Sequence, residues 1–322
     1  MKQRRALSSL LLLALTACPS VQMQEWQETT IRKLRVTARV TDIPDGAQQV
    51  RVWMPAPVTV HGLELRSPLA VTALGGPFAE KSDAEGNRYL FLQAPTAKDG
   101  SISLGYEVTL ACSRVPPPMM DGSTSGLWES SPMELEGDQQ LLTQIRKKAL
   151  IVTAQHPTWF GKARALAGWL LQDFRDGPEQ GLALCFEKMR GDRLDINRLY
   201  VTACRSLGMK ARIEAGFALP AGDGVSSLDE VLVWTSILIP GIEWIPVDLR
   251  DAQLRPEEWE SRFGGLDQPR IRMISNEGTN LDPSMGDGIP KLFLKPHAEC
   301  DGKVWAGLKI TMNVKSIANE EE

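Results

Sequence analysis

The sequence predicts an α+β protein in which an antiparallel β-sandwich precedes a domain of mixed helices and strands. Two observations lead to this prediction. From Thr30 to about Arg114, apolar and polar residues alternate and no convincing helical pattern occurs. From about residue 138 onward, apolar residues recur at three and four positions, and strand-like runs follow. We therefore expect domains at residues 30–114 and 138–312, a linker at 115–137 and a solvated acidic tail at 313–322.

Residues 1–17 have the pattern of a secretory signal peptide. The first five residues include three basic ones, and the apolar run at residues 7–15 is too short to span a membrane, which takes about 20 apolar residues. Leu15-Thr16-Ala17-Cys18 then forms a lipobox. We expect Cys18 to be lipidated and to hold the mature chain on a membrane, with residues 18–29 as a tether.

The residue after the lipidation site indicates the destination. Pro19 follows Cys18 where an inner-membrane sorting signal has Asp. By the sorting rule known from enterobacteria, we expect a lipoprotein of the cell envelope, at the outer membrane rather than the inner. Whether it faces the periplasm or the cell surface stays open.

The charge balance argues against nucleic acid as a partner. The chain carries 36 Lys and Arg against 40 Asp and Glu, a net charge of −4, and loss of the three basic signal residues brings this to −7. An acidic chain without a clustered basic stripe lacks the usual footprint for phosphate backbones. We also expect no cofactor and no metal ion.

Strand patterns define the first domain. Every even position from Ile102 to Cys112 is apolar. The same alternation occurs from Leu34 to Val40 and from Val50 to Met54. Turn signals such as Pro44-Asp45-Gly46 separate the runs. Trp53 is expected to pack in the sheet, and His61, in a loop, is given no role.

The linker begins with Val115 and three prolines. A proline run stiffens the chain and donates no ladder hydrogen bonds, so we expect it to hold the two domains apart at a defined distance.

The second domain begins with two amphipathic helices. Their apolar faces run from Leu141 to Leu150 and from Trp159 to Phe174. Trp159 and Trp169 are therefore interpreted as core residues, and His156, before Pro157, as a turn residue.

The organising stretch of the chain is Gly191 to Phe217. Ile196, Leu199, Tyr200, Ala203, Cys204 and Leu207 form one buried helical face. Gly208 is expected to end this helix in a left-handed conformation, and residues 210–217 alternate as a strand does.

This stretch resembles the core of the bacterial transglutaminase-like (papain-like) superfamily. The family carries Gly-Asp/Asn-Cys at the helix start and Arg-x-Leu-Gly-x-x-Ala-Arg further on, which is matched by Arg205, Leu207, Gly208, Ala211 and Arg212, while Leu199, Tyr200 and Gly216 also fit. The segment from Val231 to Ala252 is similar to the family's His-x-Trp strand, Pro-Gly turn and Trp-x-Pro-Val-Asp strand, through Trp234, Pro240, Gly241, Trp244, Pro246, Val247 and Asp248. The resemblance extends from about Arg35 to Lys303.

Two of the family's three catalytic positions are changed. Arg193 stands where the resemblance places the cysteine nucleophile, and Leu232 where it places the histidine base; only Asp248 is retained. Leucine transfers no proton, and an always-charged guanidinium is not a nucleophile. A further family histidine aligns with Asn197. The resemblance therefore implies a pseudoenzyme, with Trp234, Asn197 and Trp244 marking a vestigial substrate groove.

We hypothesise that Arg193 spans the vacated site and pairs with Asp248, because an unpartnered carboxylate in a partly buried site is costly. The alternative is that Arg193 is a surface residue and Asp248 helps to close a turn. Asp192 and Asp195 are expected to offset the cost of a cation at a helix N-terminus.

Two functions follow as hypotheses. The first is a non-catalytic, membrane-anchored binding or scaffold protein that holds an envelope protein or a peptidoglycan-derived peptide. The second is a cryptic acyltransferase or peptidase with a relocated nucleophile at Cys185.

The cysteines leave disulfide pairing open. Cys112, Cys185, Cys204 and Cys300 would allow two disulfides in three ways in an exported protein. For Cys112 and Cys204, which lie on apolar faces, we expect buried free thiols.

Overall fold

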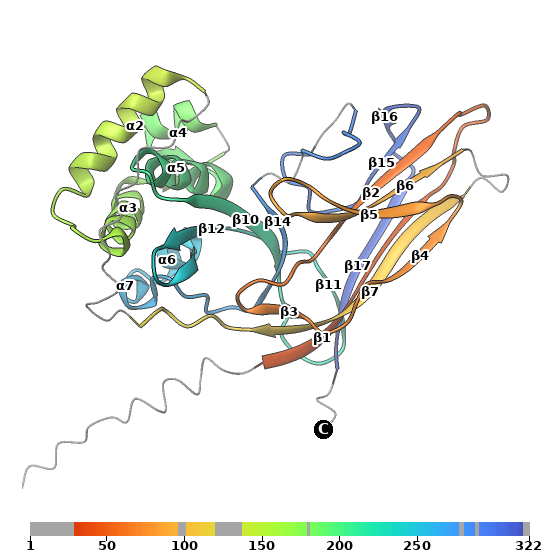
Figure 1. Ribbon diagram of the computed structural model, residues 1–322, viewed down its shortest axis with the longest axis horizontal. Helices are drawn as coiled ribbons and strands as arrows, with labels where there is room; N and C mark the ends of the chain where they lie inside the picture. The colour runs from red at the N-terminus through yellow and green to blue at the C-terminus, as the bar shows by residue number, and fades with distance from the viewer. Residues whose placement is uncertain are drawn as a thin grey trace, which may run out of the picture.

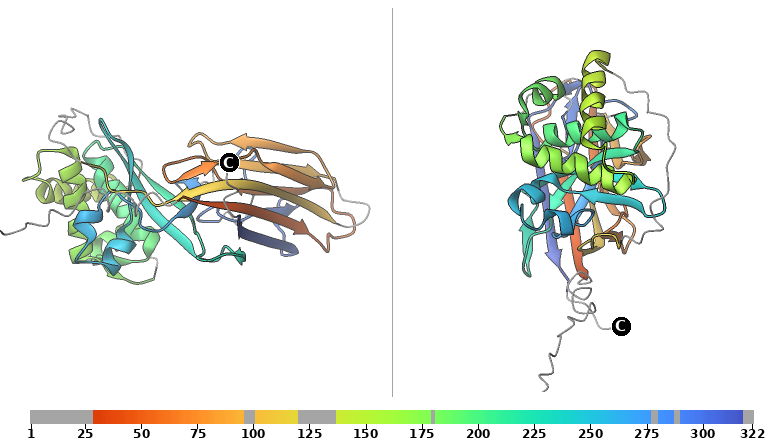
Figure 2. Two further views of the ribbon diagram at one scale, coloured as in Figure 1. Left: turned by 90° about the horizontal axis from the view of Figure 1, so that it is seen from below. Right: turned by 90° about the vertical axis from the view of Figure 1, so that its left-hand side faces the viewer.

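A computed structural model describes residues 29–95, 101–119, 137–178, 181–276, 280–286 and 290–317. The predicted signal peptide, Cys18, most of the linker and the end of the acidic tail lie outside these residues. The described chain forms two halves, one built of strands and one containing all the described helices, which lie side by side in two views (Figures 1 and 2). Among the described residues, no helix combines the length and apolar composition needed to cross a membrane.

The strand-rich half is a sandwich of two antiparallel sheets, as predicted. The first sheet has the order β11 (Val225–Ser227), β17 (Leu308–Ser316), β1 (Thr29–Val40), β7 (Ile102–Ser113) and β3 (Leu63–Leu65), with β4 (Ala70–Leu74) also on β7. The second sheet has the order β16 (Lys303–Val304), β15 (His297–Cys300), β2 (Val50–Ala56), β6 (Arg88–Ala94) and β5 (Phe78–Ser82).

The apolar residues of the predicted alternation form the core of the sandwich. In the β1–β7 pair, Val36 lies opposite Tyr106 and Ala38 opposite Leu104, and all four side chains are buried. Trp53 is fully buried, and its indole Nε1 donates a 2.9 Å hydrogen bond to the carbonyl of Pro283. Its predicted packing role is confirmed.

The sandwich also uses the C-terminal part of the chain, which the predicted division at residue 312 missed. β15 pairs with β2, and β17 pairs with β1 from Val40↔Leu308 to Arg32↔Ser316. Residues 297–316 therefore belong to the first half, although we assigned them to the second domain and the tail. Alternation marks a strand but does not say which distant strand completes its hydrogen bonds.

The second half packs helices against an antiparallel sheet with the order β13 (Glu243–Val247), β12 (Val231–Ile239), β10 (Ala211–Ala218) and β14 (Arg270–Ser275). Its helices are α2 (Gln139–Val152), α3 (Trp159–Asp173), α4 (Leu182–Lys188), α5 (Arg193–Ser206), α6 (Leu249–Leu254) and α7 (Trp259–Arg262), and a short parallel pair joins β8 (Arg175–Asp176) to β9 (Arg190–Gly191). The α+β fold class is confirmed.

Helix α5 and strand β10 form the predicted helix-stop-strand unit. Asp192 caps the helix by accepting from the backbone N–H groups of Leu194 and Asp195, and the Asp195 side chain accepts from the backbone of Asp192 in return. Gly208 has a φ of 88°, the left-handed conformation expected after the last turn. The buried face of α5 packs on β10 and β12.

The two halves are in contact, so the expectation that the linker holds them apart is wrong. Val115 exchanges backbone hydrogen bonds of 2.9 and 2.7 Å with Leu266. Val115 and Leu266 also share a small apolar cluster with Ala218, Leu232 and Trp234. The three prolines lack backbone N–H groups. Val115, directly before them, uses both its N–H and its carbonyl in bonds to Leu266, and so attaches the start of the linker to the second half.

The four cysteines beyond Cys18 are free and buried, so no disulfide joins them. This confirms the expectation for Cys112 and Cys204, and resolves the open question for Cys185 and Cys300. Each thiol packs as a small apolar group.

Candidate functional site

Arg193 occupies the first position of helix α5, after the Asp192 cap. Its guanidinium Nη1 donates a 3.2 Å hydrogen bond to the carbonyl oxygen of Val231, at the start of β12. This contact is exposed to solvent. The start of helix α5 therefore lies beside the start of strand β12, which also carries Leu232.

Leu232, at the histidine position, lies in β12 opposite Gly216 of β10. Its side chain is buried in the apolar cluster with Val115, Ala218, Trp234 and Leu266. At the position that the resemblance assigns to the proton acceptor, the structure thus has a packed apolar side chain.

Asp248 caps helix α6 and forms an ion pair with a residue that the sequence analysis did not single out. Its Oδ1 accepts from the backbone N–H of Asp251 at 3.0 Å. Its Oδ2 lies 2.8 Å from Nη1 of Arg270, and the two side chains are 11% and 6% exposed. The hypothesis that Arg193 pairs with Asp248 is therefore wrong, and the alternative of a surface Arg193 and a turn-closing Asp248 describes the structure.

Arg270 escaped the sequence analysis because it lies 22 residues from Asp248, on β14. The sequence of β14 nevertheless contains a pattern that could have drawn attention to Arg270. In Arg-Ile-Arg-Met, two arginines alternate with apolar residues, and every residue of β14 is buried. Two buried arginines on one strand face require partners, but periodicity does not identify them.

The three predicted groove residues do not share one face of the sheet. Asn197 is buried between α5 and β12, where Nδ2 donates to the carbonyl of Arg193 at 2.7 Å and Oδ1 accepts from Thr235 at 2.8 Å. Trp234 projects to the opposite face of β12, because successive side chains alternate. Asn197 is therefore a structural residue, whereas Trp234 and Trp244 line a common cavity.

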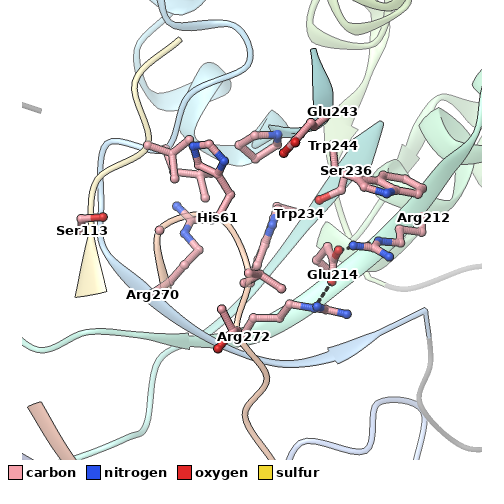
Figure 3. A pocket seen from close by; sticks show the side chains of 16 residues that line it. His61, Ser113, Arg212, Glu214, Trp234, Ser236, Glu243, Trp244, Arg270 and Arg272 are labelled. Atoms are coloured by element: carbon pink, nitrogen blue, oxygen red, sulfur yellow. Dashed lines mark hydrogen bonds and ion pairs between the residues drawn. The ribbon is translucent and has the colours of Figure 1, made fainter. Parts of the chain in front are cut away.

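This cavity, of about 280 Å³, lies where the sandwich meets the second half. The second half contributes Trp234 and Ser236 from β12, Trp244 from β13, and arginines from β10 and β14 (Figure 3). The sandwich contributes residues 59–62, which include His61. The sequence analysis gave His61 no role, because the sequence of a loop does not indicate which other domain its side chains contact.

A buried carboxylate between two arginines forms the floor of this cavity. Nε of Arg212 donates to Glu214 at 2.7 Å, and Nε of Arg272 forms an ion pair with the other carboxylate oxygen (Figure 3). Burial raises the pKa of Glu214 although both arginines favour its charged form. Burial also lowers the pKa of Arg272, partly offset by Glu214.

Two arginines of the cavity stack on its tryptophans. The guanidinium carbon of Arg212 is 4.1 Å from the ring centroid of Trp244, and that of Arg270 is 4.9 Å from Trp234. Such cation–π contacts orient both guanidinium planes and both rings. The cavity is therefore a preorganised arrangement of cations and aromatic walls.

Cys185 lies on α4 and is fully buried. Burial, followed by the nearby carboxylates of Asp195 and Asp192, raises its pKa to about 12. A thiol in this environment has neither the thiolate population nor the solvent access of a nucleophile.

No group of three or more His, Cys, Asp or Glu within the described part of the chain is arranged to hold a metal ion.

Comparison with known proteins identifies a family domain within the second half. Residues 146–249 match the family model of the Transglutaminase-like superfamily. No curated protein matches the chain in sequence.

Two solved structures are similar to the chain. A proposed cysteine protease from Cytophaga hutchinsonii is 13% identical, with a TM-score of 0.52 over 92% of this chain and 93% of that one. The periplasmic domain of TgpA from Pseudomonas aeruginosa is 15% identical, with a TM-score of 0.35 over 75% of this chain and 97% of that domain. The first likeness, at so low an identity, shows a shared fold. The chain therefore contains a transglutaminase-like domain at residues 146–249.

Proposed function

We propose that the protein is a non-catalytic member of the superfamily that serves as a binding or scaffold protein, anchored in the cell envelope through Cys18. One observation carries this proposal. Asp248, the retained position of the triad, is engaged by Arg270 and by the N-terminus of α6. Together with Arg193 and Leu232 at the other two positions, this leaves no nucleophile, no base and no free orienting carboxylate there.

The physical requirements of cysteine chemistry support this proposal. A thiolate must lie within reach of a proton acceptor, and a third group must orient that acceptor. At these positions the chain has an exposed guanidinium, a leucine in an apolar cluster and an ion-paired aspartate. Each of these residues has its own structural contacts, which supports a non-catalytic role.

The alternative function, a cryptic enzyme that uses Cys185, has less support. A relocated nucleophile needs a base within hydrogen-bond reach. The nearby titratable groups of Cys185 are Asp192 and Asp195, which cap α5 and oppose thiolate formation. The buried position of the thiol favours a packing role.

Thiol labelling tests the two functions against each other. We expect the folded chain to take up less than about 0.1 equivalent of a thiol probe at pH 8, because pKa values of about 12 leave almost no thiolate at Cys112, Cys185 or Cys204. Burial also raises the pKa of Cys300, whose side chain is buried. The same chain in denaturant should label at all four internal cysteines. Labelling would be measured by intact mass on a Cys18→Ser form, which removes the lipidated thiol.

Arg193→Cys provides the matched control for this experiment. It places one thiol at the exposed first turn of α5, where a helix N-terminus stabilises a thiolate, so we expect one rapidly labelled equivalent. Rapid labelling of Cys185 in the unmodified fold, together with substrate turnover that is lost in Cys185→Ala, would overturn the non-catalytic proposal.

The membrane anchor is tested separately. We expect the full-length chain to fractionate with outer membranes and its mature N-terminus to carry the mass of a lipidated Cys18. Cys18→Ser should remove the protein from the membrane fraction, because the buried acyl methylenes provide the attachment. Cys300→Ser, at a buried thiol, is the matched control and should stay membrane-bound. A wild-type chain without lipid would contradict the anchor.

A further inference from the structure

Around the cavity between the two halves, the arginines outnumber the carboxylates that pair with them by one; Arg270 and Arg272 are buried, and Arg212 is partly buried. Three arginines line it: Arg212, Arg270 and Arg272. Two carboxylates form ion pairs with them: Glu214 is shared by Arg212 and Arg272, and Asp248 pairs with Arg270. Glu243 also lines the cavity but is exposed, so solvent screens its charge. In a site of low dielectric, this unbalanced charge favours one additional anion.

The donors for such an anion are in place. Arg212 and Arg272 both use Nε to contact Glu214, so the terminal Nη groups of both side chains are not used by that carboxylate. The side chain of Arg272 is 6% exposed and that of Arg212 is 22% exposed. A hydrogen bond to Glu214 holds Arg212, and an ion pair with the same carboxylate holds Arg272. Planar guanidinium groups of this kind match the two oxygens of a carboxylate.

The walls of the cavity limit the size and the polarity of the rest of the ligand. Trp234, Trp244, Pro246 and Leu266 present apolar surface around the arginines. At about 280 Å³ the cavity is smaller than most drug-sized sites, so it suits a small molecule or the end of a chain. A single excess charge favours a monoanion over a phosphate monoester, which carries close to two charges at neutral pH.

We infer that this cavity binds a monocarboxylate, with the carboxylate on the Nη groups of Arg212 and Arg272 and a small apolar group against the tryptophans. The inference rests on the proposed binding role and specifies its ligand class. Two sources share this chemistry: a small organic acid and the free C-terminus of a peptide.

Calorimetric titration with matched acids and amides tests the inference. We expect benzoate and N-acetyl-alanyl-alanine to bind the wild-type chain, and benzamide and the peptide amide not to bind. Tighter binding of the peptide acid assigns a peptide C-terminus, and tighter binding of benzoate assigns a small organic acid. Equal binding of acids and amides, or tighter binding of inorganic phosphate, would overturn the inference.

Charge variants locate the site. Arg212→Gln should weaken benzoate binding about tenfold or more, because it leaves Arg272 balanced by Glu214 and removes the excess charge. Arg35→Gln is the matched control: Arg35 also pairs with a glutamate, Glu107, but on the exposed sandwich surface, and this variant should bind as the wild type does. Equal weakening by both variants would show a general charge effect and reject the site.

A second variant leaves all three arginines of the cavity unchanged. Thr59→Glu adds a carboxylate on the exposed sandwich loop that lines the cavity, and it should also weaken benzoate binding about tenfold or more. Unchanged affinity in both Thr59→Glu and Arg212→Gln would reject the inference. Turnover and thiol labelling on the same preparations separate it from the proposed function: a cavity that binds no acid in an inactive chain refutes only the ligand, whereas acid binding by a thiol-dependent enzyme refutes only the non-catalytic role.

Discussion

Replacement of Arg270 by methionine is expected to lower the free energy of unfolding by about 3–5 kcal/mol, because it leaves Asp248, a carboxylate only 11% exposed, without its charged partner. The Arg270 side chain is itself buried, so the removed charge was not screened by solvent. Urea denaturation at pH 7 measures the effect, and an unchanged m-value would show that the fold is retained.

Arg193→Gln is the matched control, since it removes the arginine that the sequence suggested as the partner of Asp248. Its hydrogen bond to Val231 is exposed, and we expect a change within about 0.5 kcal/mol. The double change Arg270→Met with Asp248→Asn should recover part of the stability, because the unpaired charge is gone. Equal losses for Arg193→Gln and Arg270→Met would contradict the ion pair described here.

Gly216→Ala is expected to destabilise the protein by about 3 kcal/mol or more. Gly216 lies in β10, where the register with β14 shifts between Ala215 and Gly216. An added Cβ would overlap the backbone carbonyl of Ile271 on β14, so the strand itself would have to move. Because β14 carries Arg270 and Arg272, benzoate binding should weaken together with stability.

Gly222→Ala separates steric overlap from backbone strain. An added Cβ at Gly222 meets nothing within 4 Å, although its φ of 92° favours glycine. We expect a loss of about 1 kcal/mol and no change in ligand binding. Chemical denaturation of both variants makes the comparison, and a loss at Gly222 as large as that at Gly216 would contradict the close approach of β10 and β14.

On the proposed function, the organisation of the site is an example of a fold that persists while its chemistry changes. Helix α5, its cap and the strand that follows keep the superfamily pattern, while Arg193 and Leu232 contribute a surface contact and an apolar cluster. Function resides in the groups placed on a fold rather than in the fold. In this chain, the charged and aromatic groups converge on the other face of the sheet from α5, at the junction with the sandwich.

Local patterns predicted much of the architecture. The alternation in β1, β2 and β7 predicted strands with one buried face, and the three- and four-residue spacing predicted α2, α3 and α5. These predictions hold because the spacing of apolar residues depends on which side chains of a single segment face the core and which face solvent. The same patterns did not predict the pairing of β15 with β2 or of β17 with β1, because these partners lie at the other end of the chain.

The sequence by itself determined the α+β class, the helix that ends at Gly208, and the resemblance that places Arg193, Leu232 and Asp248 at the catalytic positions. Only the tertiary structure decided that Asp248 pairs with Arg270, that residues 297–316 complete the sandwich, and that Arg212, Glu214 and Arg272 meet beside two tryptophans. The physical reason is that an ion pair or a strand pairing is a relation between distant residues. Composition and spacing show that a buried charge needs a partner, and the fold selects which residue provides it.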